Sequence, residues 1–435
     1  MTYGRKIVTV HPRISGRVRC HCRSARRKGK RSRITLTASL PYHRNNNTGA
    51  GERLRKIYLT GDDRMIVGVL KEIKQDENRV SLLPVGAEAL VEHSHQVLIE
   101  TKAGVASGFS DNEYVAAGAK IVSNAKDVYR RADMIMKVKE ALPSEYTLLS
   151  KGQIAFAYFH FAASEELTRA FVDSECVAIA YETIETEDGH LPLLTPMSEV
   201  AGRMAVQQGA KYLEREHGGR GVLLGGVPGV EPATVVILGG GVVGANAAQM
   251  AAGLGARVYI LDTNLERLRY LSDVMPPNVI TMMSNNYNIR ELIKVADVVI
   301  SSVLIHGAMA PKLITRNMLS SMKKGAVVVD VAIDQGGSLE TSYATTHEDP
   351  IYEVDGVIHY CVGNMPGAMP VTSTIALTNA TLPYAIEIAD KGYERAILGN
   401  SAIRKGVNIV LGKITYANVA DAFGLPYTPI EEVLA

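Results

Sequence analysis

The stretch that decides the fold lies between residues 235 and 262: Val235-Val-Ile-Leu-Gly239-Gly-Gly241-Val-Val-Gly244-Ala-Asn-Ala-Ala-Gln-Met, then Arg257-Val-Tyr-Ile-Leu-Asp262. An apolar run ends in spaced glycines, small residues follow, and a second apolar run ends in a carboxylate 18 positions after Gly244. Gly239 permits a tight strand-to-helix turn, Gly241 lets backbone amides approach a pyrophosphate, and Gly244 lets the helix pack closely on the strand. This order predicts a dinucleotide-binding unit.

Asp262 indicates which dinucleotide is bound. A carboxylate at this position accepts hydrogen bonds from the ribose hydroxyls of adenosine, and its charge repels the additional phosphate of NADP. The positive end of the helix dipole faces the phosphates. The glycines alone would arise by chance about 0.3 times in a chain of this composition, so the inference depends on the strands and helix around them. We expect NAD as the cofactor.

Charge is distributed unevenly along the chain. Residues 1–64 contain 17 Lys or Arg against 3 Asp or Glu, whereas the remaining residues contain 30 against 42. The basic segment lacks the apolar periodicity of a packed core and the apolar stretch of a secretory signal. We interpret it as a disordered or upstream extension, with Met65 as the natural start and no nucleic-acid partner. An organellar transit peptide and a functional basic arm are the alternatives.

The cysteines and the apolar stretches indicate the cellular compartment in which we expect the protein. Cys20, Cys22, Cys176 and Cys361 form no disulfide framework and suit a reducing compartment. Cys20-His-Cys22 lacks a second pair of ligands, so we expect no metal. The uncharged stretch 233–256 is long enough to span a bilayer, but its glycines, Asn246 and Gln249 favour the strand-turn-helix interpretation. We therefore expect a cytoplasmic protein that does not enter a membrane.

From Met65 onward, short apolar strands alternate with helical segments, as in doubly wound α/β proteins. Helices are expected at 84–93 and from near Ser198 toward Glu216, and strands at 66–70, 96–100, 132–138, 152–161, 177–181, 279–282, 297–303 and 326–332. Helical sequence from Thr374 to the C-terminus is expected to return to the first unit. At 435 residues, two cores are expected. We predict two doubly wound α/β domains with an active-site cleft between them: 65–192 plus 370–435 for substrate, and 193–369 as a Rossmann NAD-binding domain.

Two residues are candidates for proton chemistry. His160 follows an apolar run near the carboxyl end of a strand, where open α/β sheets bind ligands. We interpret it as a proton-transfer residue, with a buried structural histidine as the alternative. Asp334 ends the apolar run that begins at Val327 and precedes a Gly-Gly turn. Asp330 competes with it, although four positions earlier it is expected to pack within or beside the sheet.

Three basic residues are candidates for binding a carboxylate. Lys137 and Lys139 alternate with apolar residues at a strand end, where one of them can hold a substrate oxygen or both can be solvated. Arg79 follows the first strand, and its planar fork suits a carboxylate; a surface charge is the alternative.

Several segments, taken in order, resemble bacterial alanine dehydrogenases. They are Gly68-Val-Leu-Lys-Glu-Ile-Lys with Glu77-Asn-Arg79-Val, Tyr158-Phe-His160-Phe-Ala, Gly221-Val-Leu-Leu-Gly-Gly-Val-Pro-Gly-Val, the Gly239 fingerprint, Val331-Ala-Ile-Asp334-Gln-Gly-Gly, and Tyr360-Cys-Val-Gly-Asn-Met-Pro-Gly-Ala. The resemblance extends from Met65 to the C-terminus and leaves residues 1–64 uncovered.

The resemblance implies reversible oxidative deamination of L-alanine to pyruvate and ammonium with NAD⁺, in a homohexamer. It assigns proton transfer to His160, a catalytic role to Asp334, and substrate binding to Arg79 and Lys139. The implied NAD contacts are Ser198, Gly239, Gly241, Val242, Val243, Gly244, Asp262, Arg267, Ser284, Val303, Leu304, Val331, Ala332, Ile333, Asp334, Val362, Gly363, Asn364 and Met365.

Two other classes remain open. The NAD-binding subunit of a proton-pumping transhydrogenase resembles the same family but lacks amino-acid chemistry. A regulatory NAD-binding protein without turnover is the third class. The presence of Lys139, His160 and Asp334 together favours the dehydrogenase.

Overall fold

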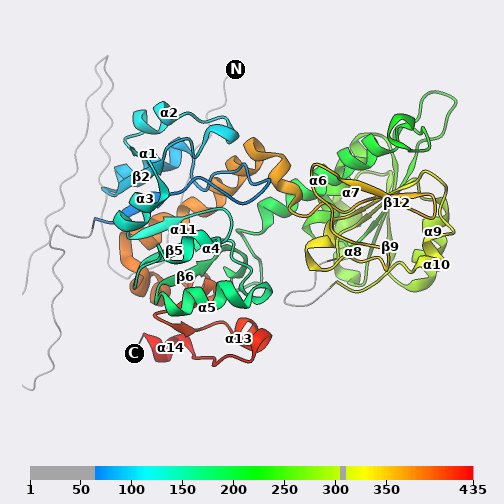
Figure 1. The fold of residues 1–435 in the computed structure, drawn as a ribbon. Coiled ribbons are helices and arrows are strands. Elements are labelled where there is room, and N and C mark those ends of the chain that lie inside the picture. The colour runs from blue at the N-terminus through cyan, green and yellow to red at the C-terminus, as the bar shows by residue number, and fades with distance from the viewer. Residues whose placement is uncertain (1–63, 304–309, 435) are drawn as a thin grey trace, which may run out of the picture. The chain divides into compact units, whose positions relative to one another are not determined.

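The computed structural model, drawn in Figure 1, describes residues 64–303 and 310–434. The Cys20-His-Cys22 cluster, the basic segment up to residue 63 and Leu304 lie outside the described residues.

The first sheet has eight strands in the order β15-β14-β6-β5-β4-β1-β2-β3. Strands β1 to β6 pair in parallel, whereas β14 and β15 are antiparallel. Their bounds are β1 Ile66–Val69, β2 Gln96–Glu100, β3 Lys120–Val122, β4 Met134–Met136, β5 Ile154–Ala157, β6 Val177–Ala180, β14 Val407–Val410 and β15 Lys413–Ile414. The accompanying helices are α1 Pro84–Glu92, α2 Asp111–Ala116, α3 Ala125–Arg131, α4 Pro143–Tyr146, α5 Glu165–Asp173, α11 Pro370–Gly399, α12 Ser401–Gly406, α13 Ala417–Phe423 and α14 Ile430–Val433.

The second sheet has seven strands in the order β12-β13-β11-β10-β7-β8-β9, parallel except for β12. Their bounds are β7 Thr234–Leu238, β8 Arg257–Asp262, β9 Val279–Met283, β10 Val298–Ser301, β11 Val327–Asp330, β12 Ile351–Val354 and β13 Val357–Tyr360. The accompanying helices are α6 Thr195–Tyr212, α7 Val242–Gly253, α8 Leu265–Val274, α9 Asn286–Val295 and α10 Arg316–Leu319.

The two sheets share one winding order. In each, the chain starts at an inner strand, adds two strands on one side, and then returns to add the remaining strands on the other, so the order reverses between β1 and β4 and between β7 and β10. This is the doubly wound arrangement of nucleotide-binding folds, in which ligands bind beyond the carboxyl ends of the strands at the reversal point. The predicted α/β class with a Rossmann unit is confirmed.

The strands are continuous apolar runs because both faces of each sheet are covered. All residues of β5, β6, β7 and β11 are buried, as expected for parallel sheets. Ser164 caps α5 by accepting a hydrogen bond from the Leu167 amide. In the described part of the chain, no helix is long and apolar enough to cross a membrane.

Two sequence expectations are corrected. The strand expected over 152–161 ends at Ala157, and a short 3-10 helix, η2, begins at Phe161. The segment after Thr374 is not helical throughout, because β14 and β15 follow α12 and extend the first sheet along β6. The run Val407-Asn-Ile-Val is too short for periodicity to separate strand from helix, and burial against β6 selects the strand.

Close helix packing positions the glycine-rich turn after β7. In α6, a Cβ at Gly202 would lie 2.2 Å from the carbonyl oxygen of Val243 in α7. In α7, a Cβ at Gly244 would lie 1.8 Å from the carbonyl oxygen of Gly239. Both obstacles are backbone atoms, which cannot rotate away as a side chain does. Glycine at these positions therefore allows α6, α7 and β7 to approach.

We predict that Gly202→Ala separates α6 from α7 and lowers the free energy of unfolding by about 1–3 kcal/mol, the usual cost of overpacking. Urea denaturation measures this change. Gly253→Ala is the matched control, because a Cβ at this α7 position meets no atom within 4 Å. The control should be neutral or stabilising, since alanine favours a helix over glycine by about 1 kcal/mol. Equal stability of the two variants would contradict the packing argument.

Candidate active site

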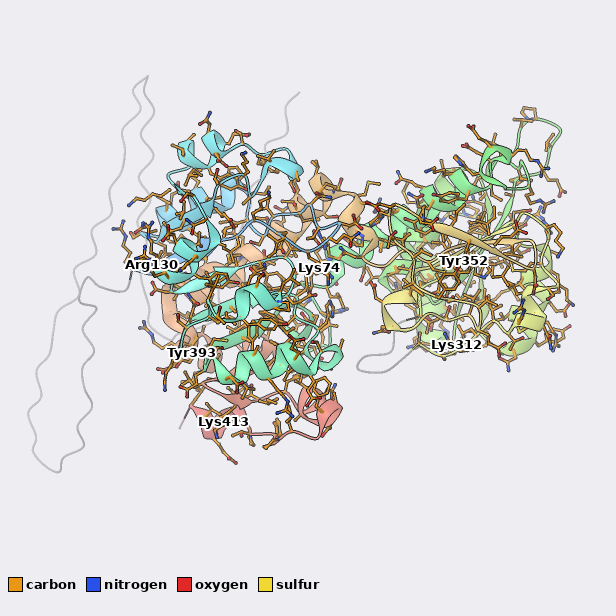
Figure 2. All side chains as sticks on the ribbon, viewed as in Figure 1. Lys74, Arg130, Lys312, Tyr352, Tyr393 and Lys413 are labelled. Atoms are coloured by element: carbon orange, nitrogen blue, oxygen red, sulfur yellow. The ribbon has the colours of Figure 1, made fainter. Side chains whose placement is uncertain are left out.

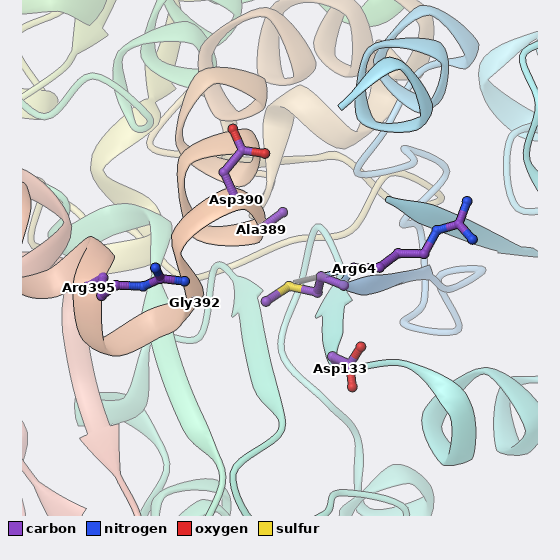
Figure 3. Close-up of a pocket in the computed structure, with 7 residues that line it drawn as sticks. Arg64, Asp133, Ala389, Asp390, Gly392 and Arg395 are labelled. Atoms are coloured by element: carbon purple, nitrogen blue, oxygen red, sulfur yellow. The ribbon is translucent and has the colours of Figure 1, made fainter. Parts of the chain in front are cut away.

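Two cavities differ in their position on the strands. One, of about 270 Å³, is lined by Arg64, Met65, Asp133, Ala389, Asp390, Gly392 and Arg395 (Figure 3). Met65 and Asp133 immediately precede β1 and β4, so this cavity lies at the amino ends of the strands. The other, of about 580 Å³, is lined by Gly189, His190, Leu191, Leu194, Thr195, Ser198, Gly239, Gly241, Val242, Val243, Leu261, Asp262, Thr263, Ser284, Ser302, Val303, Pro311 and Leu313. The carboxyl ends of β7, β8 and β10 border this cavity, and ligands of such folds bind at these strand ends.

The glycine-rich turn fits a dinucleotide. Gly239 has a φ of 100°, which side chains disfavour. Gly241 lines the larger cavity, and a Cβ there would meet no atom within 4 Å, so this backbone is open to a ligand. The Ser302 hydroxyl donates to the carbonyls of Leu238 and Gly239, at 2.9 and 3.1 Å, and holds the turn in place. The turn therefore presents accessible backbone at the amino end of α7, as a pyrophosphate requires.

Asp262 lies at the mouth of this turn. One carboxylate oxygen accepts a hydrogen bond from the Gly240 amide at 2.7 Å, and the other accepts one from the Asn264 amide at 2.7 Å. Arg267 Nε donates to the Gly240 carbonyl at 2.6 Å. The carboxylate also lines the cavity, so it can meet a ribose while it fixes the turn.

The structure brings together only some of the predicted cofactor residues. Those lining the larger cavity are Ser198, Gly239, Gly241, Val242, Val243, Asp262, Ser284 and Val303. Those that do not line it are Gly244, Arg267, Val331, Ala332, Ile333, Asp334, Val362, Gly363, Asn364 and Met365. Sequence reasoning missed the segment from Gly189 to Thr195, although Pro196 is a signal that α6 begins before Ser198.

His160 has an unusual backbone conformation. Its φ of 52° and ψ of 43° are left-handed, which is uncommon outside glycine. Glu182, which follows β6, accepts the amides of Phe159 and His160 at 3.1 and 2.6 Å. These bonds end β5 and fix the turn. The His160 side chain is exposed, which excludes the buried-histidine alternative.

Arg79 is buried and held by several partners. Its Nε donates to Glu77 Oε1 at 2.6 Å, its Nη2 pairs with Glu77 Oε2 and donates to Asn364 Oδ1 at 2.8 Å, and its Nη1 contacts Met197 Sδ at 3.0 Å. Burial raises the pKa of Glu77, but hydrogen bonds and charge from Arg79 outweigh burial and leave that pKa below its usual value. Among the residues that the structure describes, Nη1 has only a sulfur acceptor, so this edge of the guanidinium is the most available to a carboxylate.

The two lysines after β4 have different environments. Lys137 is buried and donates to both carboxylate oxygens of Glu145, at 2.7 and 2.9 Å. The Lys139 ammonium has no hydrogen bond to another residue in the described ranges. Burial and the charge of Arg79 lower the pKa of Lys139, whereas Asp334 opposes this shift. Lys74, labelled in Figure 2, pairs with Glu140 and is thereby occupied. Of these three lysines, Lys139 is the one available to a substrate.

Asp330 and Asp334 have separate roles in one loop. Asp330 is fully buried and accepts hydrogen bonds from the amides of Ala332 and Ser338, at 3.2 and 2.8 Å. Asp334 lies in the 3-10 helix η5, Val331–Gln335, and its side chain is exposed. Lys312, labelled in Figure 2, donates to the carbonyls of Gly336 and Gly337 and closes the loop. Asp330 therefore holds the loop, and Asp334 is available for chemistry.

The candidate substrate residues lie around one region. Lys139 is within electrostatic range of Arg79 and Asp334. Tyr158 interacts with the charge of Arg79, and its ring is parallel to that of His160, with 6.3 Å between centroids. This region can therefore bind a carboxylate through its two cations, Arg79 and Lys139. It can also transfer protons through the accessible imidazole of His160 and the carboxylate of Asp334.

Comparisons with known proteins identify the family. Residues 68–201 match the family model described as Alanine dehydrogenase/PNT, N-terminal domain, and residues 205–417 match Alanine dehydrogenase/PNT, C-terminal domain. The chain is 57% identical to alanine dehydrogenase of Methanococcus maripaludis over 371 residues, covering 85% of this chain and 100% of that protein. Identity to alanine dehydrogenase of Bacillus subtilis is 54%, covering 85% of this chain and 98% of that protein.

Solved structures agree with the sequence relatives. A structure of L-alanine dehydrogenase matches with a TM-score of 0.80 and 50% identity, covering 83% of this chain and 99% of that one. A transhydrogenase from Sinorhizobium meliloti matches with a TM-score of 0.68 and 25% identity, covering 81% of this chain and 99% of that one. Both family models and the full-length relatives lead to one conclusion: this chain belongs to the alanine dehydrogenase/PNT family.

Proposed function

We propose that the protein catalyses the reversible oxidative deamination of L-alanine to pyruvate and ammonium, with NAD as cofactor. The observation that carries this proposal is the grouping of Arg79, Lys139 and Asp334, with His160 joined to them through Tyr158. Residues 65–192 with 370–435 form the substrate domain, and residues 193–369 form the NAD-binding domain. A cytoplasmic homohexamer is the expected form of the enzyme.

The cofactor is held by the glycine-rich turn, Asp262 and the other residues that line the larger cavity. Asp262 would accept hydrogen bonds from the adenosine ribose, and the open backbone at Gly241 would bind the phosphates. When bound, the nicotinamide accepts the hydride that leaves Cα of alanine.

Arg79 and Lys139 bind the substrate. The available edge of the guanidinium takes the carboxylate, and the Lys139 ammonium takes the second carboxylate oxygen or the carbonyl oxygen of pyruvate. Because Arg79 is fixed by Glu77 and Asn364, little side-chain freedom is lost when the substrate binds.

His160 and Asp334 carry the proton chemistry. Deamination requires water to add at Cα and ammonia to leave. His160 accepts a proton from the water as the bond to Cα forms and returns a proton to the departing nitrogen. The Asp334 carboxylate stabilises the cationic nitrogen and orients the water. In the amination direction, the same groups exchange their acid and base roles.

A hydride-exchanging subunit of a transhydrogenase is the second candidate function. The full-length relatives called alanine dehydrogenase are 52–57% identical to this chain, whereas the solved transhydrogenase is 25% identical. The carboxylate-binding and proton-transfer groups favour amino-acid chemistry over hydride exchange alone.

We predict that the purified protein reduces NAD⁺ with L-alanine far faster than with D-alanine, L-glutamate or L-lysine. We expect the side chains of Arg79, Lys139 and His160 to fix the carboxylate and to present one face of Cα. NADH absorbance across the amino-acid panel measures this preference. Absence of turnover with L-alanine, combined with NADH binding and hydride exchange to an NADP-binding subunit, would favour the transhydrogenase instead.

Asp262→Ala is expected to weaken NAD⁺ use and improve NADP⁺ use relative to the parent protein. The substitution removes a charge-assisted ribose bond, worth about 1.5–3 kcal/mol or roughly 10- to 100-fold, and removes a charge that repels the phosphate. Arg267 remains beside the turn as a cation. The ratio of kcat/KM values for the two cofactors is the measurement.

Asp262→Asn is the matched variant. The side-chain carbonyl oxygen of asparagine can still accept a hydrogen bond from the Gly240 amide. This variant therefore separates the effect of losing the charge from the effect of losing the hydrogen bond that holds the turn. An unchanged cofactor ratio in both variants would show that Asp262 does not meet the ribose.

His160→Ala is expected to lower turnover by about 100-fold or more while preserving NADH affinity, because general acid-base help is typically of that size. Steady-state kinetics and NADH fluorescence titration test both points. The half-buried His217 of the second sheet's domain serves as the control through His217→Ala. Similar rates in the two variants would remove His160 from the mechanism.

A further inference from the structure

The buried carboxylate of Glu72, which lies close to Arg79 and to the backbone of Lys139, has no role in the proposed mechanism. Glu72 lies just after β1, at the point where the strand order reverses toward β4. Its Oε1 accepts the Val138 amide at 2.6 Å and the Lys139 amide at 3.4 Å. These are the backbone groups that lead out of β4 into the substrate-binding lysine. Glu72 thus controls the backbone from which the Lys139 side chain projects.

The second oxygen of this carboxylate is not satisfied. Glu72 Oε2 is buried and has no hydrogen-bond partner among the described residues, and the Lys137 ammonium nitrogen, Nζ, lies 3.7 Å away. Lys137 already donates to both oxygens of Glu145 at shorter distances. A buried carboxylate with one unsatisfied oxygen is unfavourable in its charged form.

The surrounding charges explain why Glu72 differs from its neighbours. Lys137 pairs with Glu145, and Arg79 pairs with Glu77, so both pairs are balanced without Glu72. An ionised Glu72 adds an unbalanced negative charge to this buried cluster. The titratable groups that face it come from the β1 loop, β4, α4, α3 and the turn after β6; they are Glu77, Arg79, Lys137, Glu145, Tyr129 and Tyr181.

We propose that Glu72 is a positioning residue for Lys139, and that its protonation couples the binding of the substrate carboxylate to pH. In the protonated form, Oε1 still accepts the two amides and the site carries no additional negative charge. In the ionised form, the charge of Glu72 opposes a substrate carboxylate held at Arg79 and Lys139. This inference rests on the proposed function, because it takes those residues as the substrate-binding pair.

Electrostatics support this coupling at physiological pH. Burial raises the pKa of Glu72, Lys137 and the Val138 amide lower it, and Glu77 and Glu145 raise it, so that it reaches about 7. Glu72 is therefore mostly protonated below neutral pH and ionised above it. The affinity for a carboxylate substrate should fall as the pH rises through this range.

The test compares three forms of the full chain with pyruvate as substrate, because its carboxylate does not titrate near neutral pH. Glu72→Gln keeps the amide acceptor and removes the ionisation. Glu72→Asp keeps the ionisation but is too short to hold both amides. In the parent protein, KM for pyruvate should rise about three- to tenfold between pH 6 and pH 8.5, the effect of one like charge near the substrate.

The two variants separate the two parts of the proposal. In Glu72→Gln, the rise in KM should disappear while the parental pH dependence of kcat is retained. In Glu72→Asp, KM should be higher at every pH and should still rise. A parental pH dependence of KM in Glu72→Gln would overturn the coupling. A parental KM at pH 6 in Glu72→Asp would overturn the positioning role. Absence of pyruvate turnover in the parent protein would refute the proposed function instead.

Glu100→Gln is the matched control. Glu100 ends β2, the neighbouring strand, and accepts the Lys71 amide at 2.9 Å, and burial raises its pKa as well. It does not bond the backbone of Lys139, so this variant should keep the parental pH dependence of KM. Loss of that dependence in Glu100→Gln would show that any carboxyl at this sheet edge produces the effect.

A stability measurement gives a readout that does not depend on activity. The pKa of Glu72 is higher in the folded chain than the ordinary value of 4.5. Folding then favours the protonated form, so this group's contribution is fully present below pH 4.5 and is lost as the pH rises to about 7. Urea denaturation of Glu72→Gln relative to the parent protein should therefore show a stability difference that grows from pH 5 to pH 7 and then levels off. A difference that is constant with pH would overturn the titration.

Discussion

The arrangement of this site depends on the backbone amides that parallel strands leave without a ladder partner at their carboxyl ends. Buried amides require acceptors, and here side-chain carboxylates supply them. Glu72 takes the amides after β4, Glu182 takes those after β5, and Asp330 and Asp262 take those of the turns that begin at β11 and β7. Because the acceptors lie within the structure, they fix the backbone and leave the side chains of Lys139, His160 and Asp334 available to a ligand.

The shared winding of the two sheets explains why these carboxylates and the candidate catalytic groups come from similar positions. In both sheets the order reverses beside the first strand, so the segments after β1 and β4, or after β7 and β10, meet at one edge. In the first sheet this edge carries the charged residues that suit a small carboxylate substrate. In the second it carries glycines and a serine, which suit a backbone-bound pyrophosphate. One topology therefore supports two kinds of binding through the residues that follow the strands.

Much of the fold could be predicted because its signals are local. The run from Val235 to Asp262 contains strand, turn, helix and strand in adjacent positions, and Gly239 and Gly244 have conformational or steric reasons. The end of β5 could not be predicted, because Ala157 is followed by further apolar residues and the strand is ended by Glu182, more than twenty residues later. The lysines Lys137 and Lys139 look equivalent in the sequence, and the contacts of Lys137 with Glu145 and Glu72 distinguish them. Long-range polar contacts of this kind leave no periodic pattern.

Asn364 links the substrate-binding Arg79 and its partner Glu77 to Asp334. Its amide donates to Asp334 at 3.3 Å, its Oδ1 accepts from Arg79 at 2.8 Å, and its Nδ2 donates to Glu77 at 3.1 Å. Its φ of 54° is left-handed, a conformation that asparagine tolerates better than most residues. Asparagine combines this tolerance with a side-chain donor and acceptor on one short stem. Because this one residue bonds Arg79, Glu77 and Asp334, a shift of the turn would move the environments of Arg79 and Asp334 together.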